Sequence, residues 1–443
     1  MTQNDRPGVQ ANSIQQVATS TLQPGVQRRE VWAWAMYDFA NSGYTTVVLT
    51  TVFSAYFVGV VAHGASWATL VFTCALSLSY LLVMFTMPWL GARADATAGK
   101  RRLLFSSTLV CVAATALLAT VGPGHIAWGL LILAISNYAY CVGESVVAAF
   151  LPELAKPQAL GRVSGWGWGF GYFGGMLALG LSLAWVSQAS AQGMQAAEYV
   201  PYVMVLTAVL FAVSALPSFI FLKERARPGR SVEHTGSAWS RLVFAWTTVR
   251  PAFPDFRHLL LCGALYHAGI SVVITLSSVY ATQAMGFSMA QTMMLVFTVN
   301  IAAAAGALLF GHVQDRIGHR RALAITLVGW ILMVILAVSS TDLRVFWLAA
   351  TIAGLCMGTS QSAGRAMVGA LAPDRRLAEF YALWAFATQL AAVIGPVCYG
   401  MVTWLSGGNH RLALGMTGLF FVAALYVLRR LDFARGARLR DTM

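Results

Sequence analysis

Four ionisable side chains stand in stretches of sequence that stay apolar for about 20 residues, long enough to cross a bilayer. They are Asp38 (within "WAWAMYDFANSGYTT"), Glu144, His267 and Arg365. Ionisable groups are costly in hydrocarbon, so those found there are functional candidates by default. A partly dehydrated carboxylate can exchange a proton or hold an ammonium group, and histidine can titrate near neutral pH. Arginine stays charged and offers a planar fork to a carboxylate or phosphate.

Two interpretations of these groups are open. In one, Asp38 and Glu144 handle a proton or a solute ammonium group, and Arg365 holds the anionic group of the same solute, which suits a zwitterion. In the other, Asp38 or Glu144 pairs with Arg365 and closes a gate without touching the solute. For His267, a hydrogen-bonded interior position is at least as good an interpretation as a solute site.

The elements that position these residues are predicted to be membrane-spanning helices. The 443 residues are 58% hydrophobic and 10% charged, whereas roughly a quarter of the residues in a soluble domain are charged. Apolar runs predict twelve helices, near residues 31–61, 68–90, 103–121, 125–150, 163–187, 199–222, 258–282, 290–311, 322–340, 345–370, 379–405 and 411–431. The sequence therefore predicts an all-α polytopic membrane protein.

The basic residues predict an orientation in the membrane. The formal charge is +13, and with the N-terminus inside, all 29 Lys and Arg except Arg344, Arg365 and Arg411 fall on the cytoplasmic side. This is the positive-inside pattern, and it does not indicate a nucleic-acid partner. We expect both termini in the cytoplasm and the chain in a plasma membrane, the inner membrane in a Gram-negative source. The polar residues 1–30 and 432–443 are expected to be cytoplasmic tails, the first one disordered and not a signal peptide.

A polar stretch at residues 223–257 divides the chain into two predicted six-helix bundles, 31–222 and 258–431. Within it, Trp239, Val243 and Trp246 recur at helical spacing. This pattern favours an amphipathic helix against the inner membrane face, and a solvated linker is the alternative.

Two similar loops follow the second and eighth predicted helices, "GARADATAGKRRL" (91–103) and "GHVQDRIGHRRAL" (311–323). Each gives a glycine, an aspartate four residues later, a second glycine and a basic cluster, which indicates parallel internal repeats. The aspartate can accept hydrogen bonds from the N-terminus of a neighbouring helix and so act as a releasable latch. The gating candidates are Asp95, Arg101, Arg102, Asp315, Arg316, Arg320 and Arg321, with Glu153 and Glu379 as structural charges at helix ends, where Glu379 favours the helix dipole.

The paired loops resemble motif A of the major facilitator superfamily, whose members have twelve helices in two six-helix bundles. The second loop fits the motif well. The first departs from it, with one extra residue between Asp95 and Gly99 and no basic residue after the aspartate.

A narrower resemblance rests on "YDFANSGY", "FLPELA...GRVSGWGWGFGYFGG" and "GTSQSAGRAMVGALAPDRRLAEFYAL". These segments resemble the "unknown major facilitator" family, which includes the autophagy-related vacuolar amino-acid effluxers. The resemblance implies that helices 1, 4, 7 and 10 line a central cavity, and each carries one of the four ionisable residues. On the same faces it places Tyr37, Asn41, Tyr44, Asn137, Asn300 and Gln361. The glycines of the second segment favour close helix packing, and its aromatic residues Trp166, Trp168 and Tyr172 either line the cavity or face lipid.

We therefore expect a secondary transporter that moves a small polar, amino-acid-like or zwitterionic solute by alternating access, proton-linked, with export favoured by the resemblance. The alternatives are an importer of a siderophore, peptide or other anionic molecule, and a non-transporting membrane sensor or assembly factor. No enzyme motif or phosphate-binding loop is present, and the six cysteines lack metal-ligand spacing. We expect no cofactor and no metal, and a monomer in the lipid bilayer.

Overall fold

The computed structural model describes residues 21–65, 67–225, 253–287 and 289–441. The amphipathic helix predicted around Trp239 to Trp246 lies outside these residues, as do residues 1–20 of the predicted N-terminal tail and 442–443 of the predicted C-terminal tail. The prediction of twelve membrane-spanning helices is confirmed, because twelve segments of the described chain are long and apolar enough to cross a membrane. The all-α fold class is confirmed with them.

Twelve helical segments of the N-terminal half follow one another along residues 28–221. The first span is α2 (Arg28–Tyr44), continued by η1 (Thr45–Thr51), α3 (Val52–Tyr56) and η2 (Phe57–Val61). Then come α4 (Ala68–Thr97), α5 (Lys100–Leu117) with η3 (Leu118–Thr120), α6 (Ile126–Ala148), the short α7 (Leu151–Leu154) and η4 (Pro157–Ala159), α8 (Leu160–Ala191) and α9 (Ala196–Phe221). The two short helices make a connection between the fourth and fifth spans.

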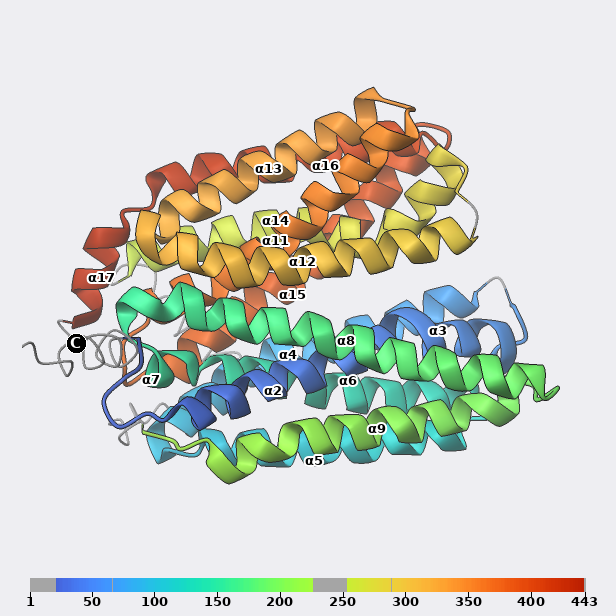
Figure 1. The fold of residues 1–443 in the computed structure, drawn as a ribbon, viewed down its shortest axis with the longest axis horizontal. Coiled ribbons are helices and arrows are strands. Elements are labelled where there is room, and N and C mark those ends of the chain that lie inside the picture. The colour runs from blue at the N-terminus through green and yellow to red at the C-terminus, as the bar shows by residue number, and fades with distance from the viewer. Residues whose placement is uncertain (1–20, 66, 226–252, 288, 442–443) are drawn as a thin grey trace, which may run out of the picture.

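The C-terminal half repeats this arrangement with fewer interruptions. It consists of α11 (Pro254–Met285), α12 (Met289–Ile317), α13 (His319–Ser339), α14 (Leu343–Leu371), α15 (Leu377–Leu405), α16 (His410–Arg430) and the short α17 (Phe433–Asp441). In each half the first span packs against the fifth and sixth, α2 against α8 and α9, and α11 against α15 and α16. The described helices therefore form two bundles of equivalent internal packing (Figure 1).

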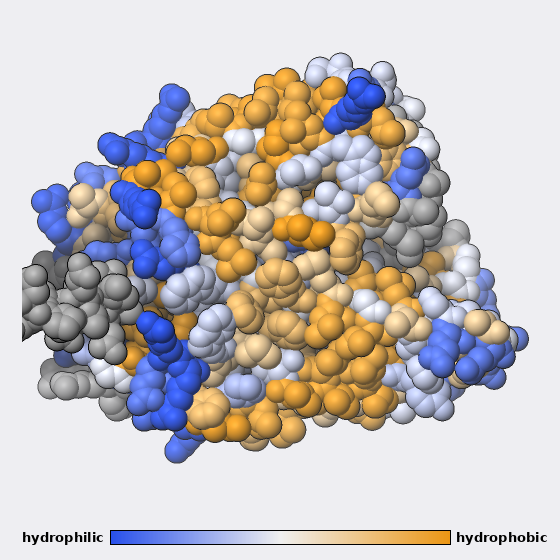
Figure 2. Space-filling view, in the orientation of Figure 1, coloured by the Kyte–Doolittle hydropathy of each residue, from blue (hydrophilic) through white to orange (hydrophobic). Residues whose placement is uncertain are grey.

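The two halves meet along α8 with α12 and α14, and along α15 with α4 and α6. The start of α2, α7 and α17 lie at one end of the molecule, on the left of Figure 1. We call it the terminal end, and the opposite one the far end. Figure 2 shows hydrophilic side chains gathered at both ends and apolar side chains over the surface between them. Such an apolar band suits the hydrocarbon core of a bilayer, so the chain is an integral membrane protein.

Two helices run further than their apolar sequence predicts. α4 ends at Thr97 and α12 at Ile317, so Asp95 and Asp315 lie in the last turns of helices and not in loops. Each helix stops where the chain turns to a left-handed conformation, at Ala98 (φ 47°) and Gly318 (φ 88°). Polar residues can continue the helices because the aspartates find hydrogen-bond partners on the other half, described below.

Candidate functional site

The two halves are joined near the terminal end by a buried ion pair. Arg365 of α14 places Nη1 2.7 Å from Oδ2 of Asp38 of α2. The side chains are only 7% and 10% exposed. A buried pair of this kind is held by geometry and hydrogen bonds, because removing both charges from water is costly. Two of the four predicted ionisable residues are thus in direct contact across the interface.

The rest of the Arg365 guanidinium is bound by α8. Its Nε donates to Oγ of Ser164 over 3.2 Å, and Nη2 donates to the Ser164 carbonyl oxygen over 3.0 Å. Arg365 also lies over two indole rings, 4.7 Å from the centroid of Trp34 and 5.3 Å from that of Trp168. Cation–π contacts gain strength when water is excluded. Asp38, Trp34, Ser164 and Trp168, all in the N-terminal half, are called the cradle below.

Glycines explain how α8 comes so near to this pair. A Cβ at Gly167 would lie 2.6 Å from Nη2 of Arg365 and 2.7 Å from the ring of Trp34, and would also meet the Asp38 carboxylate. A Cβ at Gly165 would collide with the carbonyl oxygen of Ala307 on α12. The alternating glycines therefore let α8 pack against α2, α12 and α14 at once, as small residues do in membranes.

The sequence does not single out Trp34, Ser164 or Lys100, a buried lysine described below. For Trp168 it allows either a cavity-lining or a lipid-facing position. A signal for two of these lies in the spacing. Trp34 stands four residues before Asp38, and Ser164 four residues before Trp168. Residues four apart share one face of a helix, so each pair could have been read as a single polar and aromatic surface.

Glu144 lies close to the ion pair without joining it. It is partly exposed on α6, forms a hydrogen bond with Tyr140, and interacts electrostatically with both Asp38 and Arg365. None of the six ion pairs found among the described residues includes Glu144. The site therefore holds two carboxylates and one guanidinium.

Three of the predicted neighbours make their hydrogen bonds inside the N-terminal half. Tyr37 bonds to Thr108 and Tyr44 to Ser136, each over 2.7 Å, and Asn137 donates to Ser79 over 2.5 Å. The structure does not bring these polar groups to the Asp38–Arg365 pair. Helix rotation turns them toward α4, α5 and α6, where they tie the bundle together.

His267 and Asn300 are satisfied by their own helices. Nδ1 of His267 lies 3.1 Å from the Gly263 carbonyl oxygen, and the ring packs edge-on against Trp384. Asn300 donates to the Val296 carbonyl oxygen over 2.8 Å. His267 and Asn300 are therefore hydrogen-bonded interior residues of the C-terminal half, and these contacts do not join either side chain to the Asp38–Arg365 pair.

Two predicted amide residues lie one turn deeper than the pair. Gln361 of α14 accepts a hydrogen bond from Tyr172 of α8, another contact between the halves. Asn41 of α2 is 5% exposed, and neither its amide nitrogen nor its amide oxygen has a hydrogen-bond partner among the described residues. Orphaned buried polar atoms are rare in native structures and mark a place where a ligand or water can bind.

The two repeated loops each send an aspartate to the other half. Asp315 accepts the backbone N–H groups of Gly161 and Arg162, at the start of α8, over 3.0 and 3.1 Å. Asp95 accepts the backbone N–H of Glu379, at the start of α15, over 3.1 Å. Helix N-termini attract negative charge. Both aspartates therefore connect the two halves at the terminal end, at the positions where the sequence predicts a latch.

The charged residues around the latches have mixed surroundings. Lys100 is fully buried, forms an ion pair with Glu153 and lies over the ring of Phe150. Arg376 forms a two-pronged ion pair with Glu379. The remaining gating candidates lie at the surface: Arg101 donates to the Phe219 carbonyl oxygen, Arg320 to that of Arg429, and Arg102, Arg316 and Arg321 are exposed.

Outside the membrane-spanning segments, Arg435 donates to the carboxylate of Asp255 at the start of α11 over 2.8 Å. This hydrogen bond raises the pKa of Arg435 above its ordinary value. The equivalent contact in the N-terminal half joins Arg225 to Glu30 near the start of α2. In both halves an arginine after the last span thus secures the first span.

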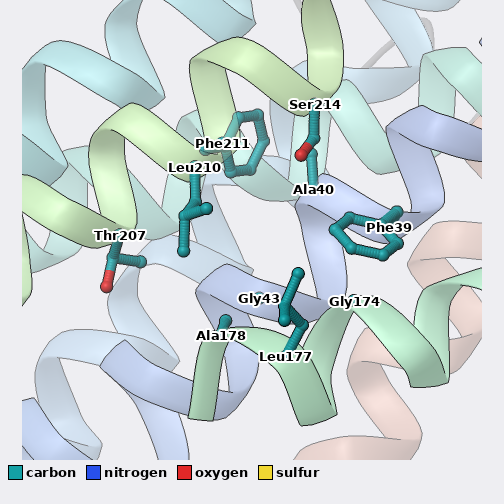
Figure 3. A pocket seen from close by; sticks show the side chains of 10 residues that line it. All are labelled: Phe39, Ala40, Gly43, Gly174, Leu177, Ala178, Thr207, Leu210, Phe211 and Ser214. Carbon is teal, nitrogen blue, oxygen red and sulfur yellow. The ribbon is translucent and has the colours of Figure 1, made fainter. Parts of the chain in front are cut away.

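Figure 3 shows a crevice between α2, α8 and α9 that is separate from this charged site. Its lining is mainly apolar: Phe39, Ala40, Gly43, Gly174, Leu177, Ala178, Thr207, Leu210, Phe211 and Ser214. The hydroxyl of Thr207 already donates to the Val203 carbonyl oxygen. The crevice therefore lacks the charges that would recognise a polar solute.

Comparisons with known proteins agree with this architecture. Residues 54–440 match the family model described as "Vacuole effluxer Atg22 like". A relative in Bacillus subtilis (strain 168), described as the uncharacterized MFS-type transporter YxiO, is 24% identical over 404 residues, which are 88% of this chain and 92% of the relative.

Solved structures share the fold at lower identity. The human organic anion transporter MFSD10 superposes with a TM-score of 0.73 and 17% identity, over 92% of this chain and 100% of that one. The proton:xylose symporter XylE gives a TM-score of 0.72 and 14% identity, over 90% and 95% of the two chains. Since the family model covers most of the sequence, and the fold is that of these transporters, the chain belongs to the Atg22-like family and is a transporter of the major facilitator superfamily.

Proposed function

We propose that this protein is a secondary active transporter that moves a small, polar, amino-acid-like solute by alternating access, and that the Asp38–Arg365 pair is its central gate. The observation that carries the proposal is this buried ion pair between the halves. A charge pair that crosses a mobile interface can exchange its partner for a charged solute, whereas an apolar contact offers no such exchange.

Three polar contacts support a conformation closed at the terminal end. They are Asp38 with Arg365, Asp95 with the start of α15, and Asp315 with the start of α8. Each joins one half to the other, and each can be replaced by water when the halves rock apart. The positive-inside pattern supports a cytoplasmic location for this end, in a plasma membrane, with the closed state facing outward.

The charges of the pair support a zwitterionic solute. When the halves separate, Asp38 stays on the N-terminal half and Arg365 on the C-terminal half. A carboxylate on one wall and a planar guanidinium on the other match the ammonium and carboxylate groups of an amino acid. The description of the matching family as vacuole effluxers supports export as the direction.

Glu144 is the proposed proton carrier. It lies close to both members of the pair, and among the described residues it has no cation of its own. An uncompensated carboxylate at this depth is costly, and binding a proton removes that cost. Proton uptake at Glu144 would then favour the pairing of Asp38 with Arg365, because it removes the negative charge that competes with Asp38 for the guanidinium.

Flux into proteoliposomes containing the purified protein tests this proposal. Labelled neutral, cationic and acidic amino acids, peptides and metal chelates would be offered with and without an imposed pH gradient. We expect saturable, gradient-stimulated flux of an amino-acid-like solute. Asp38→Asn and Arg365→Gln should abolish it, and Glu144→Gln should retain exchange but lose stimulation by the gradient.

Asp342→Asn is the matched control, because Asp342 is an exposed carboxylate that caps α14 through the Arg344 N–H, at the far end. Its flux should equal that of the unaltered protein. Transport of anionic chelates or peptides alone would contradict the proposed solute. Unchanged gradient stimulation in Glu144→Gln would contradict its role as proton carrier, and absence of flux for every solute would contradict transport.

A further inference from the structure

We propose that the cradle formed by Trp34, Asp38, Ser164 and Trp168 is a binding site for an organic cation, and that Arg365 is its internal occupant in the closed state. The solute class that follows is a compound with a guanidinium or primary ammonium group. This inference rests on the proposed function, since it names the part of the solute that enters the gate.

All four cradle residues belong to one half, and their occupant belongs to the other. Trp34 and Asp38 lie on α2, and Ser164 and Trp168 on α8, two helices packed along their length. The packing is tight, since a Cβ at Gly171 would lie 2.9 Å from Oγ of Ser42, and one at Gly174 would collide with the Phe39 carbonyl oxygen. Rocking of the halves would withdraw Arg365 and leave the cradle assembled.

Withdrawal of Arg365 would leave a carboxylate in an apolar setting without its cation. Breaking a buried pair by removing one partner is strongly unfavourable, so a cation carried by the solute is favoured at Asp38 over water alone. The replacement would find the Asp38 carboxylate, the hydroxyl and carbonyl oxygens of Ser164, and two indole faces, as the guanidinium does now.

The indole faces determine which cation fits. Trp34 and Trp168 both lie within cation–π distance of the guanidinium carbon. Rings bind weakly hydrated organic cations well, whereas a hard metal cation needs several oxygen ligands around it. Trp34 is also fixed in place, because its indole N–H donates to the Val147 carbonyl oxygen over 2.8 Å. The cradle therefore favours guanidinium or ammonium over sodium.

Unpartnered buried polar groups lie next to the cradle. The indole nitrogen of Trp168 is buried and has no hydrogen-bond partner among the described residues, and the same holds for both amide atoms of Asn41. Asn41 follows Asp38 by three residues on α2, so it lies about 4.5 Å deeper along the helix axis. The rest of the solute would find hydrogen-bonding groups there, further from the terminal end.

The test is chemical rescue of Arg365→Ala in the purified full-length protein. Guanidinium chloride and methylammonium chloride would be titrated at low millimolar concentration, with thermal unfolding and calorimetry as readouts. We expect a saturable rise in the thermal midpoint of Arg365→Ala and none in the unaltered protein. Affinity should fall at least about tenfold in Asp38→Asn/Arg365→Ala and in Trp168→Leu/Arg365→Ala. Sodium chloride and neutral urea should give no rise.

Arg435→Ala is the matched control, because it also removes an arginine from a buried carboxylate, Asp255, but the guanidinium lies over no ring among the described residues. It should show no saturable rise with guanidinium. The proposal fails if Arg365→Ala binds neither cation, if its binding does not depend on Asp38, or if Arg435→Ala is rescued equally.

A second measurement covers the case in which Arg365→Ala does not fold. Cys141 is buried at the interface, where Gln389 of α15 donates to its sulfur over 3.5 Å. A guanidinium-bearing or ammonium-bearing solute should speed alkylation of Cys141 in the unaltered protein, and its neutral analogue should not. Cys111, buried within the N-terminal half, is the control thiol. Equal rates with and without the cation would overturn the proposal.

These results are distinguishable from those on transport. Rescue of Arg365→Ala without flux of any solute would support the cation site and contradict the transporter. Flux of a neutral or anionic solute without rescue would support the transporter and contradict the cation site.

Discussion

The two halves use the same aspartate latch with different surroundings. In the C-terminal half, Asp315 receives two backbone N–H groups of α8, and the Arg162 side chain lies 3.6 Å away. In the N-terminal half, Asp95 receives the backbone N–H groups of Glu379 and Ala378, and the attraction of Lys100 is opposed by the Glu379 carboxylate. The position of the latch is thus shared by the repeats, while its charge environment is particular to each half.

The residue after the loop glycine differs in the same way. Lys100 follows Gly99 and is buried as a charge, paired with Glu153. His319 follows Gly318 and is also buried, but it bonds to the neutral amide of Gln314 over 2.6 Å. One repeat therefore stabilises its loop with an ion pair and the other with a neutral hydrogen bond. A repeated backbone can thus accept different chemistry when each side chain is satisfied locally.

The largest expected effect separates these two positions. Lys100→Met removes the buried cation paired with Glu153, which keeps the Arg225 backbone N–H, and should cost about 3–5 kcal/mol of unfolding free energy. His319→Met removes only neutral hydrogen bonds, to Gln314 and to the Pro157 backbone, and should cost about 1–2 kcal/mol. Thermal unfolding of the purified variants in the same detergent measures both. Equal losses would mean that the charge of Lys100 has no special role.

The latches themselves come next. Asp315→Asn keeps the shape but loses the charge that two N–H groups and Arg162 favour, which should destabilise the closed state by about 1.5–3 kcal/mol. Asp95→Asn should have a smaller effect, because the Glu379 carboxylate offsets part of the attraction that Lys100 exerts on the Asp95 charge. The rate of Cys141 alkylation in nanodiscs reports opening of the interface. A faster rate in Asp95→Asn than in Asp315→Asn would reverse this order.

The arginines that secure the first span of each half provide a third comparison. Arg225→Ala leaves the buried carboxylate of Glu30 with the Gln27 N–H and should cost roughly 1–2 kcal/mol. Arg435→Ala should lower the thermal midpoint less, because that guanidinium is 48% exposed and water can replace it. The thermal midpoints of the two variants, measured at low and high salt, test this order of stability loss. A larger fall for Arg435→Ala would show that exposure does not set the order.

The smallest effects concern the turns that end α4 and α12. Ala98 adopts a left-handed conformation at the place that Gly318 occupies in the other repeat. Ala98→Gly should stabilise the protein by about 1 kcal/mol, and Gly318→Ala should destabilise it by a similar amount. Nothing lies within 4 Å of a Cβ at Gly318, so its loss would come from the backbone alone. Thermal midpoints that move in the same direction would contradict this explanation.

The sequence was a good guide to the helices and a partial guide to the site. Long apolar runs predict membrane spans because hydrocarbon leaves the backbone few alternatives to a helix. The ends of α4 and α12 were predicted too early, since a polar turn can remain helical when another helix supplies its partners. The prediction places Tyr37, Tyr44 and Asn137 on the cavity-lining faces of the helices that carry Asp38 and Glu144. Their hydrogen bonds instead lie within the N-terminal bundle.

Sequence by itself determined the number of spans and the family, because these depend on local hydropathy and on short motifs. It also left a pairing of Asp38 with Arg365 as one of two alternatives. Only the tertiary structure joined these residues, which are 327 positions apart, and placed Trp34, Ser164 and Trp168 around them. The rotation of each helix and the close approach of α8 decide those contacts. They depend on packing between the halves, which no single segment of sequence contains.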